Sequence, residues 1–170
     1  MHVILHLLTM IRTKTIDKGL MSEEIKALIS EGRSVTITVR GNSMNPLIVD
    51  RRDRMTVGPW KDSDLQRGCV AFVRDSRGEY LIHRIIRREG DILTLLGDGN
   101  VNMTETADVN DVIGIMHSIE RKGRTITSDS LLWKAYSWIW MTLEPIRRWP
   151  LGLWRKLNPG KVSRPNRHNG

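Results

Sequence analysis

The sequence predicts a mainly β fold: an antiparallel β domain with a short N-terminal helix and a Trp-rich helical C-terminal extension. Three observations support this class. Short segments with alternating or continuous apolar residues recur between residues 35 and 119, each of strand length. Turn signals such as DSRGE, REGD and RKGR separate them. Little helical periodicity lies between the segments, which favours an antiparallel sheet over an alternating α/β arrangement.

The first expected element is a helix over Ser22–Ile29. Ser22 is a preferred N-cap residue, and two acids follow it in the first turn, where they favour the helix dipole. Gly32 is the expected stop, because glycine readily adopts the left-handed conformation that ends many helices.

At Val35 the period changes to two. Val35, Ile37 and Val39 would face one side of a strand, and the residues between them the other. The remaining expected strands are Arg54–Val57, Cys69–Arg74, Tyr80–Arg87, Ile92–Leu96 and Val112–Ile119.

Composition divides the 170 residues into four parts. Residues 1–32 form an N-terminal segment with the helix, and residues 33–127 form the β domain. Residues 128–157 carry five of the six tryptophans with interleaved arginines, and Pro145 and Pro150 would break them into two or three short helices. Residues 158–170 resemble a disordered basic tail.

The net charge of +8 favours an anionic partner. The single cysteine, Cys69, excludes an internal disulfide and a multi-cysteine zinc site, and its apolar surroundings favour a packed thiol over a reactive one. The apolar run near the N-terminus lacks a basic leader and is too short to cross a bilayer. We therefore expect a cytoplasmic or peripherally membrane-associated protein.

The first chemical motif is Gly41-Asn42-Ser43-Met44-Asn45-Pro46. A nucleophilic serine needs an exposed hydroxyl and nearby backbone N–H groups that can hold an oxyanion. Glycine before Ser43 permits close approach of a substrate, and proline after it stiffens the loop. The alternative is an ordinary strand-ending turn, for which all these residues are suitable.

A base for Ser43 is found in EYLIHRII, where His83 lies in an apolar strand. Histidine suits proton transfer near neutral pH, although a packed structural histidine is the alternative. His2, His6, His117 and His168 have less suitable surroundings.

The third motif is GDGN, with Asp98 between two glycines directly after a strand. Such an acid can orient an imidazole as the third member of a hydrolase triad. The alternative is an Asx-type turn.

In this order, GNSMNP, HRI, GDGN and DVIG resemble the signal peptidase I superfamily of serine peptidases, which includes the self-cleaving SOS repressors. The resemblance covers about residues 35–119. His83 stands where most bacterial signal peptidases have lysine, similar to the endoplasmic-reticulum and archaeal type. Cys69 stands where the family usually has aspartate, and the family's N-terminal membrane anchor is not matched.

The resemblance implies a signal-peptidase-like fold and a serine endopeptidase with Ser43 as nucleophile and His83 as general base. For this mechanism the resemblance implies no metal or organic cofactor. In the endoplasmic-reticulum type the acid lies a few residues beyond the Gly-Asp box. We take Asp98 as the acid, with Glu105 as the alternative and Asp108 behind it.

The resemblance also implies an extended peptide or protein substrate, leader- or signal-like, bound along a strand edge with small side chains near the cut. The backbone N–H of Ser43 would be one oxyanion donor, with Asn42 as a second. Two other functions remain open: a catalytically inactive peptide-binding or scaffold protein on the same fold, and a self-cleaving regulator.

The segment Trp133–Lys156 predicts contact with an anionic membrane surface, because Trp prefers the bilayer interface and Arg and Lys reach its head groups. Packing on the β domain or on a partner protein is the alternative. No helix-turn-helix or other recognition module is evident, so no specific nucleic-acid partner is expected.

Overall fold

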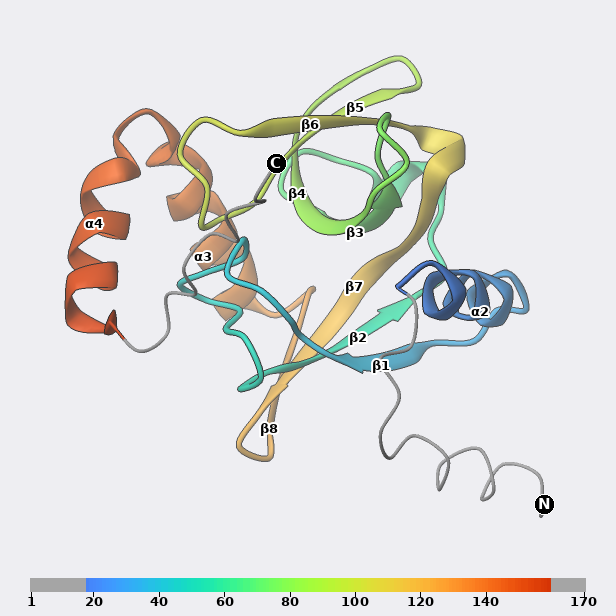
Figure 1. Ribbon diagram of the computed structural model, residues 1–170, viewed down its shortest axis with the longest axis horizontal. Helices are drawn as coiled ribbons and strands as arrows, with labels where there is room; N and C mark the ends of the chain where they lie inside the picture. The colour runs from blue at the N-terminus through green and yellow to red at the C-terminus, as the bar shows by residue number, and fades with distance from the viewer. Residues whose placement is uncertain (1–17, 160–170) are drawn as a thin grey trace, which may run out of the picture.

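The computed structural model describes residues 18–159. Within them an eight-stranded antiparallel sheet carries one helix on one side and a pair of helices on another (Figure 1). The mainly β class predicted from the sequence is therefore confirmed. The N-terminal apolar run, His2, His6, His168 and most of the basic tail lie outside the described residues.

The strand order in the sheet is β1-β2-β7-β3-β4-β5-β6, and β8 pairs with β7. The strands are β1 Val35–Thr38, β2 Arg54–Gly58, β3 Val70–Arg74, β4 Tyr80–Glu89, β5 Ile92–Leu96, β6 Thr104–Asp108, β7 Val112–Arg121 and β8 Arg124–Thr127. Strand β7 is the centre of the sheet, because it pairs with β2, β3 and β8. Irregular pairings in β2, β3 and β4 accompany the strong curvature seen in Figure 1.

Two strands, β6 and β8, were not predicted. Strand β6 reads TETAD, and its acids and threonines are weak strand signals, yet Glu105 and Ala107 point inward in alternation. Strand β8 forms a tight hairpin with β7. Lys122 and Gly123 have positive φ at its tip, in agreement with the RKGR turn signal.

The N-terminal helix α2 covers Lys18–Ser30, so it includes four residues before the expected start. Ser22 is not the N-cap. It lies inside the helix and is buried together with Ile25 and Ile29, on the face that packs against the sheet. The helix stops as expected at Gly32, which has φ +81° and donates to the Ile29 carbonyl.

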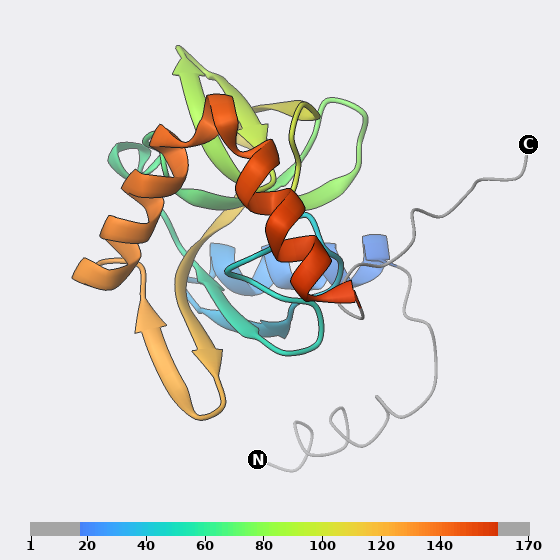
Figure 2. The same ribbon diagram turned by 90° about the vertical axis from the view of Figure 1, so that its left-hand side faces the viewer.

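The C-terminal extension forms three helical pieces, α3 Leu131–Thr142, η3 Glu144–Ile146 and α4 Arg148–Leu157. Figure 2 shows α3 and α4 together on one side of the molecule. Pro145 lies in η3, so it separates α3 from α4 as expected. Pro150 lies in the first turn of α4, where a missing N–H costs no helical hydrogen bond, so it does not break the helix.

The loop that joins β1 to β2, residues 39–53, is called the serine loop here because it contains Ser43. Its base is held by Asp53, a fully buried carboxylate. Asp53 accepts hydrogen bonds from Val49 N at 2.8 Å, from Arg52 Nε at 2.9 Å and from Arg121 Nε at 2.9 Å. Burial opposes the charge on Asp53, but the bonds from Arg121, Arg52 and Val49 outweigh it and lower the pKa of Asp53 to about 2.

Asp53→Asn should therefore destabilise the protein by about 2 kcal/mol at neutral pH, since the charged form gains the three donors only in the folded state. Because the pKa of Asp53 is lowered on folding, this stability is present above about pH 4 and is lost as the pH falls toward 2. Urea unfolding of wild type and variant between pH 2 and 7 measures it. A difference that stays constant over this range would contradict the role of the Asp53 charge.

Candidate active site

Ser43 lies in the first turn of the serine loop and is half-buried. Gly41 has φ +91° and donates to Asp50 Oδ1 at 2.8 Å, and Asn45 N donates to the Asn42 carbonyl at 3.1 Å. The Asn45–Pro46 peptide bond is cis. Met44 is buried in the core directly after Ser43. The loop is thus fixed on both sides of the serine.

His83 lies on β4 and is 5% exposed. Its Nδ1 is 2.9 Å from Oε2 of Glu105, whose side chain is also buried. Glu105 is on β6, two strands away from β4, and the order β4-β5-β6 brings it to the histidine. A carboxylate can only accept, so Nδ1 carries the proton and Nε2 is left as the basic nitrogen.

Asp98, expected first as the partner of His83, does not contact it. Its two oxygens accept from Arg84 Nε at 2.8 Å and Arg84 Nη2 at 2.7 Å, and both side chains are fully buried. His83 and Arg84 are neighbours on a strand, so their side chains leave it in opposite directions. Asp98 meets the arginine, and Glu105, the alternative acid, meets the histidine.

Arg84 also connects the site to the C-terminal helices. Its Nη1 donates to the Gly68 carbonyl at 2.7 Å and to Ser137 Oγ at 2.8 Å. Its guanidinium lies 5.2 Å from the ring centroid of Trp133. Tyr136 donates to Asp98 at 3.3 Å, and burial is the main cause that raises the pKa of Tyr136, so its hydroxyl stays a donor.

The two glycines of GDGN lie against the serine loop. Gly99 N donates to the Ser43 carbonyl at 2.7 Å. A Cβ on Gly97 would lie 2.4 Å from Ser43 O and 2.9 Å from His83 Nε2, and a Cβ on Gly99 would lie 2.4 Å from Asn42 O. Gly97 therefore packs closely against both the Ser43 carbonyl and the His83 ring, so the serine loop lies next to the histidine.

The oxyanion donors expected from the sequence, the Ser43 N–H and Asn42, stay predictions. Within residues 18–159 no hydrogen bond from the Ser43 N–H to another residue is seen. Asn42 accepts at Oδ1 from Asn45 Nδ2 at 3.2 Å and at its carbonyl from Asn45 N. These contacts fix Asn42 within the turn and leave its role as a second donor a prediction.

Asp108 and His117 do not belong to this group. Asp108 caps the short helix η2 (Val109–Asp111) by accepting from Asn110 N at 2.8 Å. His117 lies on β7, and its Nε2 is 3.0 Å from the Pro59 carbonyl.

Ser43 is among the residues that line a groove of about 300 Å³. It is lined by α2, by β1 with the start of the serine loop, and by the first half of β4, including Ile37, Val39 and Ile82. Among the described strands β1 pairs only with β2, and Tyr80–His83 of β4 pair only with β3. Two strand edges with open pairing positions therefore border the groove.

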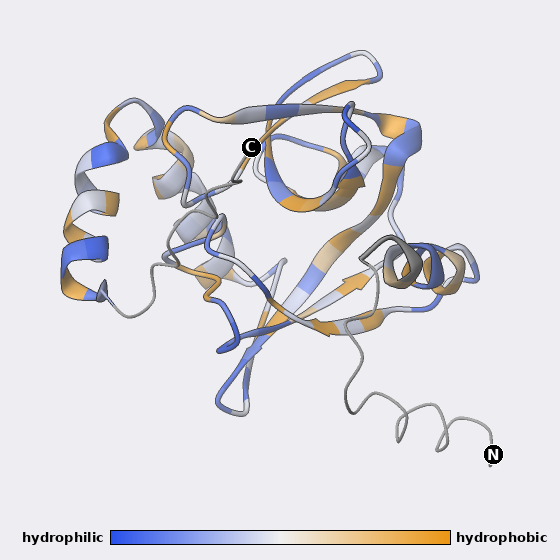
Figure 3. Cartoon of the chain, in the orientation of Figure 1, coloured by the Kyte–Doolittle hydropathy of each residue, from blue (hydrophilic) through white to orange (hydrophobic). Residues whose placement is uncertain are grey.

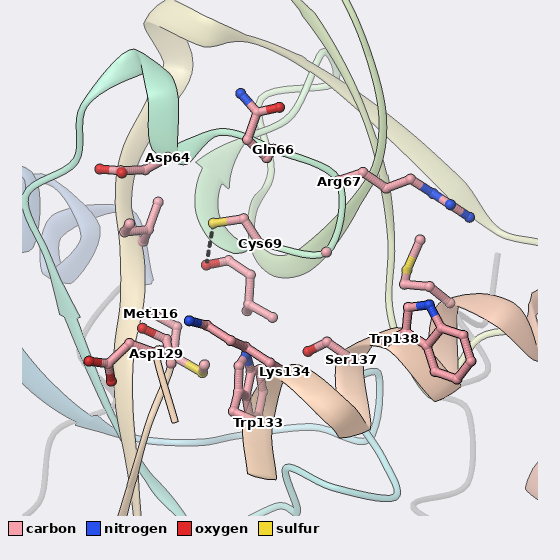
Figure 4. A pocket seen from close by; sticks show the side chains of 15 residues that line it. Asp64, Gln66, Arg67, Cys69, Met116, Asp129, Trp133, Lys134, Ser137 and Trp138 are labelled. Carbon is pink, nitrogen blue, oxygen red and sulfur yellow. Dashed lines mark hydrogen bonds between the residues drawn. The ribbon is translucent and has the colours of Figure 1, made fainter. Parts of the chain in front are cut away.

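A larger cavity, about 570 Å³, lies apart from the serine loop between β3, β7 and α3 (Figure 4). Cys69, Lys134 and Trp138 are among its lining residues. Cys69 is half-buried rather than part of the core, and burial raises its pKa to about 12, so the thiol stays protonated and unreactive at neutral pH. Its Sγ is 3.8 Å from the Val70 carbonyl.

Within the described part of the chain, no group of three or more His, Cys, Asp or Glu side chains is placed to hold a metal ion. Comparison with protein-family models, with curated proteins and with solved structures finds no match. The geometry of the site is thus the basis for assigning a function.

Gly97→Ala should disturb the site because the added methyl group overlaps the Ser43 carbonyl and His83. We expect a loss of about 1–3 kcal/mol in the free energy of unfolding, as for overpacking elsewhere in proteins. The matched control is Gly152→Ala in α4, where a Cβ meets nothing within 4 Å and alanine favours the helix. Equal effects of the two substitutions in urea unfolding would contradict the close packing.

The Arg84–Asp98 pair should show strong coupling in a double-mutant cycle. Asp98→Leu alone leaves a buried guanidinium without its carboxylate and should cost about 3–5 kcal/mol, whereas adding Arg84→Met should recover much of the loss. The control pair is Arg54–Glu120, 3.4 Å apart with both side chains exposed, for which we expect a coupling of at most about 1 kcal/mol. Additive losses for Arg84 and Asp98, measured by urea unfolding, would argue against the pair as a unit.

Proposed function

We propose that the protein is a serine endopeptidase, similar to signal peptidases, in which Ser43, His83 and Glu105 form the catalytic triad. The single observation that carries the proposal is the buried His83–Glu105 hydrogen bond of 2.9 Å, with Nε2 of the same ring directed toward Gly97 and the serine loop. A merely structural histidine does not need its second nitrogen beside a half-buried serine. The sequence motifs GNSMNP, HRI and GDGN support the same function.

In the proposed reaction, Ser43 Oγ attacks the carbonyl carbon of a peptide bond while His83 Nε2 takes its proton. Glu105 holds the Nδ1 proton and stabilises the imidazolium that forms. The Ser43 N–H donates to the oxyanion. His83 then protonates the leaving amine, the C–N bond breaks, and an acyl group remains on Ser43. Water, activated by the same histidine, hydrolyses this ester and returns the enzyme.

Ser43 Oγ forms no hydrogen bond with His83 among the described residues. Catalytic hydrogen bonds are often long without substrate and shorten when it binds, so the present geometry agrees with the mechanism.

The proposed substrate is a peptide segment in extended conformation. Ser43 lines the groove together with β1 and β4, whose open edges can pair with a peptide backbone. Its apolar lining, with Ile37, Val39 and Ile82, favours apolar side chains in the bound segment. The leader- or signal-like class with small side chains near the cut follows from the resemblance.

The test is cleavage of a panel of extended leader- and signal-like peptides in the presence of lipid vesicles. Ser43→Ala and His83→Ala should each lower kcat by about 10³-fold or more, and Glu105→Gln by about 10²–10⁴-fold, since the amide cannot stabilise the imidazolium. Mass spectrometry of the products locates the cut.

The matched control for Glu105→Gln is Asp108→Asn, three residues farther along the chain, which should leave kcat within about twofold because Asp108 only caps η2. Cleavage that persists in Ser43→Ala contradicts the mechanism. Peptides that bind wild type and all variants equally, with no product from any, favour the peptide-binding alternative.

A further inference from the structure

The C-terminal helices expose an unusual amount of apolar surface. Of the large hydrophobic side chains that are exposed in the described residues, eight lie between residues 131 and 157 and three elsewhere. The eight are Leu131, Leu132, Trp138, Ile139, Ile146, Trp149, Leu153 and Leu157. We call them, with the basic residues Lys134, Arg148 and Lys156, the outer face of the extension.

Helix α3 is apolar on both sides. Its inner side places Trp133, Trp140 and Met141 in the protein. Its outer side carries Leu131 and Trp138, two turns apart, and Trp138 is 71% exposed. Lys134 is the only charged residue in the helix. A helix that is apolar on all sides is normally buried on all sides. The outer side of α3 is exposed instead, so we expect another surface to cover it.

Helix α4 is amphipathic (Figure 3). Leu151 on its inner side is buried, whereas Trp149, Leu153 and Leu157 are spaced by four residues and form an exposed stripe. Lys156 lies beside this stripe and Arg148 begins the helix. Both helices lie on the side of the molecule that is turned toward the viewer in Figure 2.

The net positive charge of the outer face distinguishes between two surfaces that could cover it, a second copy of the chain and a lipid bilayer. From Leu131 to Leu157 the chain has five basic residues, all exposed except the buried Arg147, and one acid, Glu144. Glu144 is already 3.6 Å from Arg67. A second copy of the chain would bring like charges together, which disfavours self-association through this face. An anionic lipid surface offers the apolar layer and the negative charge at once.

No helix in the described residues is both long and apolar enough to span a bilayer. A helix of ten or twelve residues with tryptophans and lysines is instead typical of one that lies in the interface, with rings at the head-group level and basic side chains on the phosphates. Trp138 and Lys134 also line the larger cavity beside α3.

We propose that the outer face of α3 and α4 binds the surface of an anionic phospholipid bilayer, with Trp138, Trp149 and Leu153 inserted among the head groups. The contact is separate from the catalytic residues, since none of the three lines the groove at Ser43. Helix α4 nevertheless lies next to the GDGN turn, because Arg155 donates to the Gly99 carbonyl at 2.8 Å.

The experiment is co-flotation with vesicles of phosphatidylcholine containing about one third phosphatidylglycerol, compared with vesicles of phosphatidylcholine alone. Each basic residue near an anionic bilayer strengthens binding electrostatically, and salt screens this attraction. We expect binding of Ser43→Ala protein to the anionic vesicles to be at least about tenfold tighter than to neutral ones, and to weaken in high salt. Using Ser43→Ala keeps the readout independent of any peptidase activity.

Two variants test the two parts of the face. Trp138→Ser/Trp149→Ser/Leu153→Ser should lower binding to anionic vesicles by about tenfold or more, because apolar area is lost. Arg148→Glu/Lys156→Glu keeps that area and should abolish the preference for anionic lipid. The matched control is Ile92→Ser/Met103→Ser, which removes exposed hydrophobic side chains outside the extension and should bind as before.

Thermal unfolding and circular dichroism of each variant show that the fold is kept. Equal binding of wild type to neutral and anionic vesicles, equal binding of the triple variant and the Ile92/Met103 control, or no binding at all would each overturn the proposal. So would a dimer, detected by light scattering, that the triple variant dissociates, since the face would then be covered by a second copy.

Discussion

The buried ion pair between Arg84 and Asp98 is the interaction on which the arrangement of the site depends. It joins β4, directly beside His83, to the GDGN turn that packs under Ser43. Because both charges lose their hydration, such a pair adds little net stability to the fold. It instead destabilises any arrangement of β4 and the GDGN turn in which the two charges are separated. If Asp98 moved away from Arg84, a guanidinium with no access to water would lose its countercharge. The position of the serine loop relative to the strand that carries His83 is thereby fixed.

The same pair explains how far the sequence could predict the site. The positions of Ser43 and His83 followed from local motifs, whereas the identity of the acid depended on which strands become neighbours. Asp98 is close to His83 in the order of motifs but serves the opposite face of β4. Glu105 reaches the histidine only because TETAD forms strand β6 beside β5. A strand that local propensity does not favour is formed because the sheet supplies its pairing partner and core.

The fold shows the same division between local and long-range information. Strands with alternating or apolar patterns were predicted nearly to their ends, as Ile92–Leu96 and Val112–Arg121 illustrate. Ser22 was misplaced at a helix start because a capping signal is local, and its burial with Ile25 and Ile29 is a property of packing against the sheet. Asp53 gave no sequence signal at all. Its role depends on Arg121, which is 68 residues farther along the chain.

The contacts of Arg84 with α3 also bear on what counts as a structural unit in this chain. Composition suggests a boundary near Ser128, where a β-rich region gives way to tryptophan-rich helices. Yet Ser137 and Tyr136 complete the hydrogen bonds of the buried pair, and Trp133 covers the guanidinium. A shortened chain ending before the helices would therefore expose the buried Arg84–Asp98 pair to water. The helical extension therefore belongs to the same structural unit as the β region, because its side chains complete the surroundings of the Arg84–Asp98 pair.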